Sequence, residues 1–302
     1  RAGVRVALPS MWGGQFGLDS SSPAVDRVVR AALDDPLVEL TGLHFHRGTT
    51  IRSTDDVDGH IGDILAYADA LYRRTGWWPS VLDVGGSLAT PTVGAIPMVE
   101  FRLNRAFASD LLPPDPTSTA GLGQVSTMLR DAVDAHCQAG GLPAPRIVIE
   151  PGRAMTANTQ MLLTTVLDVK RDGSITHAVL DAGINVAEPV QSEYHQLFSV
   201  TAPTAAATES YRLAGPICTP ADVLYNNWRL PELRPGHVLA IMDAGAYFVP
   251  FSTSFSFPRP GIVMQDGGVV VPLRAAETMD DLVRHDVDLE STTAAVWERG
   301  GR

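Results

Sequence analysis

The sequence contains very little lysine, little cysteine and no long apolar run. Only one of its 302 residues is a lysine, Lys170, and 22 are arginines. The two cysteines, Cys137 and Cys218, lie far apart, which predicts reduced thiols rather than a disulfide framework. The richest apolar stretch, residues 238–251, is interrupted by Asp243 and Pro250, so no transmembrane helix is predicted. No signal peptide is visible, and we expect a cytoplasmic protein without membrane contacts.

Charge and composition narrow the class of protein further. A net charge of -11 argues against nucleic acid or an anionic membrane surface as the main partner. Hydrophobic residues make up 45% and charged residues 19%, as in ordinary soluble globular proteins. The length allows two domains or one large one.

The first half of the sequence alternates short apolar runs with amphipathic segments. Apolar runs rich in β-branched residues predict four strands, at residues 4–8, 40–46, 80–86 and 146–152. Apolar spacing predicts helices between them, at residues 22–33, 57–74 and 122–139. Strand and helix in alternation indicate parallel βα units. A closed barrel needs eight such units, so we expect the first four to be missing from the N-terminal side.

The pattern changes after about residue 162. Strands without long helices between them are predicted at residues 162–170, 177–181, 238–242 and 268–273. This pattern is typical of an antiparallel β domain. We expect residues 91–116, which are rich in proline, to be irregular, and residues 277–284 to form a short closing helix.

Two predicted strands end in residues suited to binding a phosphate. Gly85 and Gly86 follow one strand, and Gly152 and Arg153 follow the next. Backbone amides without side chains can approach a phosphate, although two glycines after a strand more often form a tight turn. Counted from the end of a barrel, these are the loops after strands seven and eight, where barrel phosphate sites lie. Glu150 ends an apolar strand and needs a partner, which could be a ligand or a neighbouring arginine.

Five segments in register carry a resemblance to a known family. They are residues 42–49 (GLHFHRGT), 82–86 (LDVGG), 150–154 (EPGRA), 215–218 (GPIC) with Asp222, and 242–247 (MDAGAY). Over residues 1–285 the chain resembles the fold-type III pyridoxal-phosphate decarboxylases that act on diaminopimelate, ornithine and arginine. The resemblance implies an alanine-racemase-like (β/α)8 barrel followed by an antiparallel β domain. Residues 1–162 would form the C-terminal half of the cofactor-binding barrel. Residues 163–302 would form a β-sandwich or β-barrel-like domain with a short terminal helix.

The resemblance also implies roles for individual residues. His46 would stack on the pyridoxal phosphate ring; without the resemblance, it would be read as a core histidine. Glu150 would pair with the pyridine nitrogen and sustain the ring as an electron acceptor. The phosphate would be held by a set of small, hydroxyl and basic residues, namely Thr49, Gly85, Gly86, Ser87, Gly152, Arg153 and Tyr247. Ser87 stands where the family often has a third glycine.

Cys218 would donate a proton to the carbanion, reaching into the active site of the other subunit of a homodimer. The alternative is a small buried core residue. Cys137, on a predicted helix, is read as structural.

Departures from the family pattern concern the amino-acid substrate. Thr219 follows the cysteine where diaminopimelate decarboxylases usually have an acidic residue, and Glu188 lies where they have an arginine. Arg153, Asp222 and Phe255 complete the predicted substrate-binding set. We therefore do not expect meso-diaminopimelate as the substrate. Phe255 indicates a more apolar pocket, unless it packs the domain junction. No metal ligand is assigned.

The lysine that would hold the cofactor as a Schiff base belongs on the first barrel strand, among those not found. Lys170 precedes a turn and is read as solvated. We expect a longer gene product; a second polypeptide or a degenerate homologue are the alternatives.

Two functions remain, an amino-acid α-decarboxylase and a non-catalytic homologue acting through protein contacts. Racemisation is a less favoured third, because racemases of this fold usually pair the lysine with a tyrosine and lack the cysteine motif.

Overall fold

The first part of the chain forms an open parallel sheet. The structure, a computed structural model, describes residues 3–5, 17–46 and 50–287. The sheet has the order β2-β1-β3-β4-β6, and its neighbouring strands pair in parallel. Its strands are β1 (Gly3–Arg5), β2 (Leu18–Asp19), β3 (Gly42–Phe45), β4 (Val81–Asp83) and β6 (Arg146–Val148). The predicted parallel βα units are confirmed. In this sheet only β2 was not predicted, because two residues are too few to form a recognisable apolar pattern.

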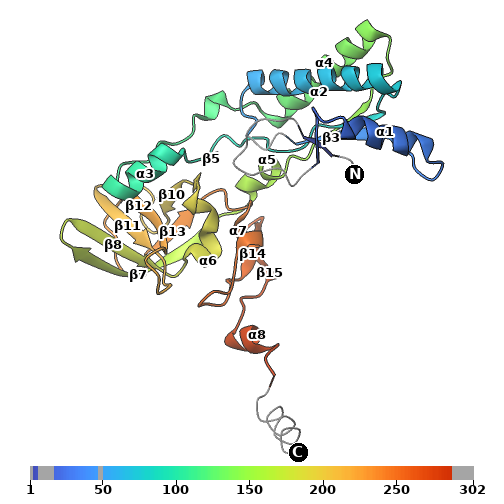
Figure 1. Cartoon of the computed structure of the whole chain (residues 1–302). Coiled ribbons are helices and arrows are strands. Elements are labelled where there is room, and N and C mark those ends of the chain that lie inside the picture. The colour runs from blue at the N-terminus through green and yellow to red at the C-terminus, as the bar shows by residue number, and fades with distance from the viewer. Residues whose placement is uncertain (1–2, 6–16, 47–49, 288–302) are drawn as a thin grey trace, which may run out of the picture.

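Helices cover one face of this sheet (Figure 1). They are α1 (Ala24–Asp34), α2 (Thr54–Thr75) and α4 (Leu122–Gly140), close to the predicted ranges. α2 begins at a capping box in which the Ser53 hydroxyl accepts from the Asp56 amide, and it ends at Gly76 with φ 73°. Both caps satisfy backbone groups that the helix itself leaves unpaired.

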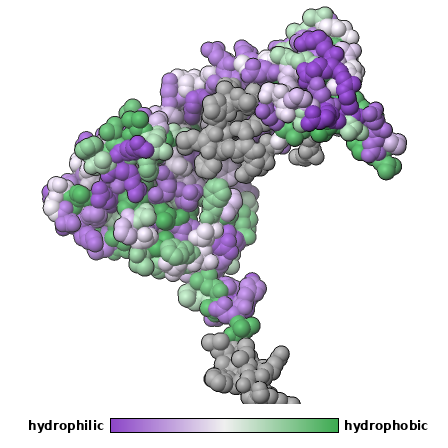
Figure 2. Space-filling view, viewed as in Figure 1, coloured by the Kyte–Doolittle hydropathy of each residue, from purple (hydrophilic) through white to green (hydrophobic). Residues whose placement is uncertain are grey.

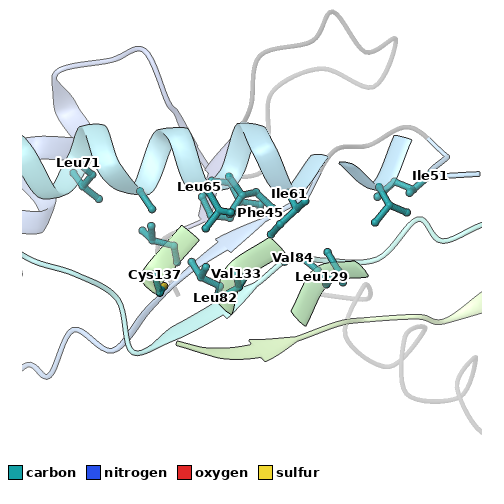
Figure 3. Packing of buried hydrophobic residues seen from close by; sticks show 14 of the residues in the cluster. Phe45, Ile51, Ile61, Leu65, Leu71, Leu82, Val84, Leu129, Val133 and Cys137 are labelled. Carbon is teal, nitrogen blue, oxygen red and sulfur yellow. The ribbon is translucent and has the colours of Figure 1, made fainter. Parts of the chain in front are cut away.

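A hydrophobic core lies between the helices and the sheet (Figure 3). Phe45 and Leu82 from the strands are fully buried, as are Ile64 and Leu71 of α2 and Val133 of α4. Because side chains alternate along a strand, the neighbours of these strand residues point to the other face. That other face carries the polar side chains described below.

The proline-rich excursion is not irregular, as the sequence had indicated. It contains β5 (Gly94–Ala95), the ten-residue helix α3 (Met98–Phe107) and the 3-10 turn η1 (Pro116–Ser118). Prolines flank α3 without entering it: Pro97 stands at its N-cap, where a missing N–H costs nothing. The high proline content of the flanks therefore concealed a regular helix.

The second part of the chain is a six-stranded sheet with the order β10-β13-β7-β8-β11-β12. Its strands are β7 (Leu162–Asp172), β8 (Ile175–Leu180), β10 (Leu197–Ser199), β11 (Glu209–Ala214), β12 (Val223–Leu230) and β13 (Val238–Ile241). The predicted antiparallel arrangement is wrong for one pair, since β8 and β11 run parallel. The connection between them is long enough for a crossover and includes α6 (Ile184–Ala187), η3 (Glu188–Gln191), β9 (Glu193–Tyr194) and β10. A separate core of buried residues, among them Leu180, Leu213 and Leu239, packs this unit.

Smaller elements complete the described chain. Residues after the parallel sheet form α5 (Arg153–Thr156) and η2 (Ala157–Thr159), and residues after β13 form α7 (Phe248–Phe251). The chain continues into the hairpin β14 (Ile262–Asp266) and β15 (Val269–Arg274), then into α8 (Met279–Val283), which confirms the predicted closing helix. The hairpin exposes apolar side chains, seen as green atoms above the tapering end in Figure 2. Lys170 lies exposed near the end of β7, as predicted.

Candidate active site

A cavity of about 210 Å³ lies where the two units of the chain meet. Loops after β3, β4 and β6 contribute to its walls, so it lies at the carboxyl ends of the parallel strands, where ligand sites of such sheets occur. β9 and the turn before α7 close it from the second unit. Its walls include Thr50, Ser87, Thr90, Glu150, Gly152, Arg153, Glu193 and Tyr247. Antiparallel pairing of β5 with β9 holds the two units together beside this cavity.

The predicted glycines lie where strand ends approach one another. Gly85 has φ 76°, and a Cβ there would lie 2.1 Å from the carbonyl oxygen of Phe45. A Cβ on Gly86 would lie 2.4 Å from the carbonyl oxygen of Glu150. Both positions therefore require glycine for close packing of the loops after β3, β4 and β6. Gly152 differs: a Cβ there would point at the Tyr247 hydroxyl at 3.5 Å, so its glycine leaves the cavity wall open.

Glu150 faces the polar side of the sheet beside His44 and Asp83. The His44 Nε2 lies 3.5 Å from the Glu150 Oε2, and potential ligand atoms of all three residues lie within 4.8 Å of one another. Asp83 also accepts a hydrogen bond from the Gly85 amide at 3.0 Å. A histidine is thus one neighbour of Glu150. This grouping of one imidazole and two carboxylates was not assigned from sequence as a possible cation site.

A partly buried group of charged and aromatic side chains lines the same cavity. The Arg153 guanidinium donates to the Glu193 carboxylate at 2.5 Å and stacks over the Tyr247 ring, with its central carbon 5.2 Å from the ring centre. His195 is fully buried, and its Nε2 faces the second Glu193 oxygen at 3.6 Å, a separation longer than a hydrogen bond. The other His195 nitrogen, Nδ1, lies 2.9 Å from the Met242 carbonyl oxygen and donates to it.

The electrostatics of this group follow from its contacts. Burial alone would raise the pKa of Glu193, but the facing His195 ring and the Arg153 guanidinium together lower it by more. The pKa of Glu193 therefore lies below its usual range, and the carboxylate is ionised at neutral pH. Neither Glu193 nor His195 was predicted as a site residue, because 40 residues separate Glu193 from its partner Arg153.

The loop with Cys218 lies on the surface, between β11 and β12. Cys218 is exposed, whereas Cys137 is buried in the first core. Asp222 is only 2% exposed, and its two oxygens accept from the amides of Ile184 and Ile217. Both oxygens of Asp222 thus bind backbone amides, and its predicted contact with substrate stays a prediction.

Other predicted residues are dispersed. His46 and Glu188 are exposed, Phe255 is 60% exposed, and Thr219 is partly buried beside Cys218. Neither Phe255 nor Cys218 is among the residues that line the cavity. Thr49 lies outside the described residues, although its neighbour Thr50 lines the cavity. The structure thus brings together Ser87, Glu150, Gly152, Arg153 and Tyr247 from the predicted set.

Comparison with known proteins places this geometry in a family. The family model described as pyridoxal-dependent decarboxylase, C-terminal sheet domain, matches residues 81–245, which include the cavity walls contributed by Glu150, Arg153 and Glu193. The chain belongs to the pyridoxal-dependent decarboxylase family. The resemblance read from the five sequence segments is thereby confirmed.

Individual members of the family match over most of the chain. Diaminopimelate decarboxylase of Methanothermobacter thermautotrophicus is 28% identical over 89% of this chain and 58% of its own length. That of Zymomonas mobilis is 30% identical over 84% of this chain and 54% of its own length. This decarboxylase-family chain therefore spans between half and three fifths of the length of these two relatives.

Solved structures show the same fold. The diaminopimelate decarboxylase of M. jannaschi superposes with a TM-score of 0.74 at 22% identity, covering 91% of this chain and 58% of the other. The Helicobacter pylori enzyme complexed with L-lysine gives a TM-score of 0.70 at 21% identity, covering 92% and 61%. The likeness supports the predicted combination of a βα unit and a sheet unit. The described residues form an open sheet, and its membership of a closed eight-stranded barrel stays a prediction, as does the domain boundary at residue 162.

Among the described residues, no helix is long and apolar enough to cross a membrane.

Proposed function

We propose that this chain provides the phosphate cradle, the pyridine partner and the proton donor of a pyridoxal-phosphate-dependent amino-acid α-decarboxylase. The observation that carries the proposal is the convergence of Ser87, Gly152, Arg153 and Tyr247 around one cavity that Glu150 also lines. The family supports the cofactor, and the relatives named above support an amino acid as substrate.

The cavity residues fit the phosphate of the cofactor. The missing side chain at Gly152 leaves space before the Tyr247 hydroxyl, which a Cβ would partly fill. Hydroxyl groups of Ser87 and Tyr247, the Arg153 guanidinium and the open backbone at Gly152 are the donor types that bind phosphate. Thr49 and the loop at Gly85 and Gly86 belong to the same proposed cradle.

The remaining roles concern the ring and the substrate. When bound, pyridoxal phosphate supplies an electron-accepting ring that stabilises the charge left at the substrate Cα as CO2 departs. Glu150 would accept a hydrogen bond from the protonated pyridine nitrogen, and the His44 Nε2 lies 3.5 Å from the same carboxylate. His46 would lie against the ring face. Cys218 would then donate its thiol proton to Cα.

Cys218 is exposed and is not part of the cavity wall of its own chain. We therefore propose a homodimer in which each subunit supplies Cys218 to the other's site. Completion of the barrel, and the lysine that attaches the cofactor, would come from a longer gene product or a second polypeptide.

The substrate is proposed to be an amino acid or modified amino acid other than meso-diaminopimelate. Arg153 already pairs with Glu193, so its charge is offset before any substrate carboxylate arrives. Glu188, at the position of a family arginine, adds negative charge instead. A second carboxylate on the substrate would therefore find little net positive charge here. Phe255 and Thr219 remain proposed substrate contacts, and the subunit that supplies Cys218 to the other's site would supply them as well.

The test uses the protein purified from its native source with any polypeptide that copurifies. Addition of pyridoxal phosphate should give a bound visible absorbance band, and a panel of amino acids should include one that releases CO2. Replacing Cys218 with alanine should slow turnover at least tenfold, since a general acid contributes about 10²–10⁴ in rate. Cys137→Ala is the matched control and should keep the rate.

The outcomes separate the candidate functions. Cofactor binding without CO2 release from any amino acid would favour the non-catalytic homologue, and absence of cofactor binding would reject the proposal. Release of CO2 from meso-diaminopimelate at the highest rate of the panel would reject the proposed substrate class alone.

A further inference from the structure

The loop that carries Cys218 is a closed turn built on its own backbone. It joins β11 to β12, and the Gly215 amide donates to the Asp222 carbonyl oxygen at 3.0 Å across its base. Within the loop, the Thr219 amide donates to the Ile217 carbonyl at 2.8 Å, and the Asp222 amide to the Thr219 carbonyl at 3.0 Å. Cys218 therefore lies at the exposed tip of a short, internally bonded turn.

One buried carboxylate ties this turn to a second segment of the chain. The Asp222 Oδ2 accepts from the Ile217 amide at 2.8 Å, and its Oδ1 accepts from the Ile184 amide, also at 2.8 Å. Hydrogen bonds to an ionised acceptor are stronger than those between neutral groups. Asp222 thus links the residue preceding Cys218 to the first residue of α6.

Two glycines make room for this link. A Cβ on Gly183 would lie 2.6 Å from the Asp222 carboxylate oxygens, and a Cβ on Gly215 would lie 2.3 Å from its Oδ2. Real Cβ atoms do not approach oxygen this closely. Gly215, the first residue of the GPIC motif, is accordingly required by the carboxylate that it encloses.

We propose that Asp222 is a positioning residue for Cys218. By fixing the Ile217 amide, it orients the residue that precedes Cys218 and thereby sets the direction of the thiol. The importance of that direction for catalysis rests on the proposed function, whereas the anchoring itself does not. This role is distinct from the direct substrate contact predicted for Asp222 from sequence.

The test measures the motion of the loop tip directly. A nitroxide spin label is attached to Cys218 in a Cys137→Ala background, and its electron paramagnetic resonance spectrum is recorded with Asp222 and with Asp222→Asn. Asparagine offers one oxygen, so one amide loses its acceptor and faces an NH2 group. We expect the label's rotational correlation time to fall about threefold, as for a loop released to nanosecond motion.

A matched control is available in the same sheet unit. The Asp181 Oδ1 accepts from the Thr165 amide at 2.8 Å and from the Thr164 hydroxyl at 2.7 Å. Asp181→Asn therefore makes the same chemical change at a carboxylate whose donors lie on β7 and not in the loop, and it should leave the spectrum of the label unchanged. Unchanged spectra in Asp222→Asn, or equal mobility in both variants, would overturn the proposal.

A second variant keeps the carboxylate and removes one donor. Ile184 is the first residue of α6, where proline is tolerated, so Ile184→Pro deletes the amide that binds Oδ1, together with a side chain that packs against the core of the sheet unit. It should mobilise the label in the same sense as Asp222→Asn, and a rigid label would count against the anchoring. If Asp222→Asn does not fold, Ile184→Pro still tests whether the loop is anchored.

Kinetics of the holoenzyme separate this inference from the proposed function. Asp222→Asn should lower kcat about tenfold with KM unchanged, because a displaced acid impairs the chemical step and not binding. An equal rise in KM instead would overturn the positioning role. If the protein releases no CO2 at all, the decarboxylase proposal fails while the spin-label result still decides the anchoring.

Discussion

The ion pair between Arg153 and Glu193 offers a quantitative test of the site, through Glu193→Gln. Glutamine keeps an oxygen that can accept from the guanidinium but loses the charge. Charged hydrogen bonds contribute about 1.5–3 kcal/mol and neutral ones about 0.5–1.5 kcal/mol, so the free energy of unfolding should fall by about 1 kcal/mol. Side chains only 20% and 18% exposed place the pair between surface pairs and fully buried ones, so a loss near 2 kcal/mol is the upper expectation.

The pH dependence of this effect has a definite sign. The folded-state pKa of Glu193 is depressed, so its contribution is present above the unfolded pKa and is lost as pH falls through the folded pKa. The difference between wild type and Glu193→Gln should therefore be constant near pH 7 and shrink below about pH 4, the ordinary pKa of glutamate. Urea unfolding followed by tryptophan fluorescence measures both quantities.

Glu232→Gln is the matched control for this measurement. Glu232 pairs with Arg234 at 3.2 Å, but both side chains are about two-thirds exposed, at 68% and 70%. Its replacement should leave the unfolding free energy unchanged within error, because exposed pairs contribute little. A Glu193→Gln difference equal to that of Glu232→Gln, or one that persists unchanged at pH 3, would refute the reasoning.

The same substitution has a second consequence for anion binding. Without the Glu193 charge, Arg153 becomes available to an anion in the cavity, so inorganic phosphate should stabilise Glu193→Gln more than wild type. The gain follows the mass-action relation between ligand concentration and stability, measured as the shift of the unfolding midpoint with phosphate. A smaller shift in the variant would show that Arg153 does not face the ligand.

Three further predictions concern the cavity rim, the core and the thiols. Gly86→Ala should weaken pyridoxal phosphate binding at least tenfold in a fluorescence titration, because its Cβ would lie 2.4 Å from the Glu150 carbonyl oxygen and displace the cavity wall; unchanged affinity would count against it. Leu82→Ala should lower the unfolding free energy by about 2–5 kcal/mol in urea, since Leu82 is fully buried. Iodoacetamide should modify exposed Cys218 and spare buried Cys137 in the native protein, as read by peptide mass spectrometry; faster reaction at Cys137 would contradict the described core.

Local pattern accounts for much of the fold. Apolar periodicity located the helices near α1, α2 and α4, because each buries one stripe against the sheet. It located the strands β3, β4 and β6 because their apolar side chains pack into the core beneath these helices. It failed at α3, where the surrounding prolines outweighed a short helical segment. It also did not indicate β11 or β12, and so missed the parallel pairing of β8 with β11. Pairing partners depend on the path of the connection, which composition does not specify.

The sequence by itself determined the family, the parallel and sheet units, and the motif residues Glu150, Gly152, Arg153 and Tyr247. These are readable because backbone constraints and family motifs act over a few neighbouring residues.

Only the tertiary structure decided what each group faces. It placed Glu193 against Arg153 across 40 residues, gave Glu150 a histidine neighbour, and joined Asp222 to the backbone amides of Ile184 and Ile217. Charges and hydrogen bonds act through space, so their partners are set by how the units pack and not by their spacing along the chain.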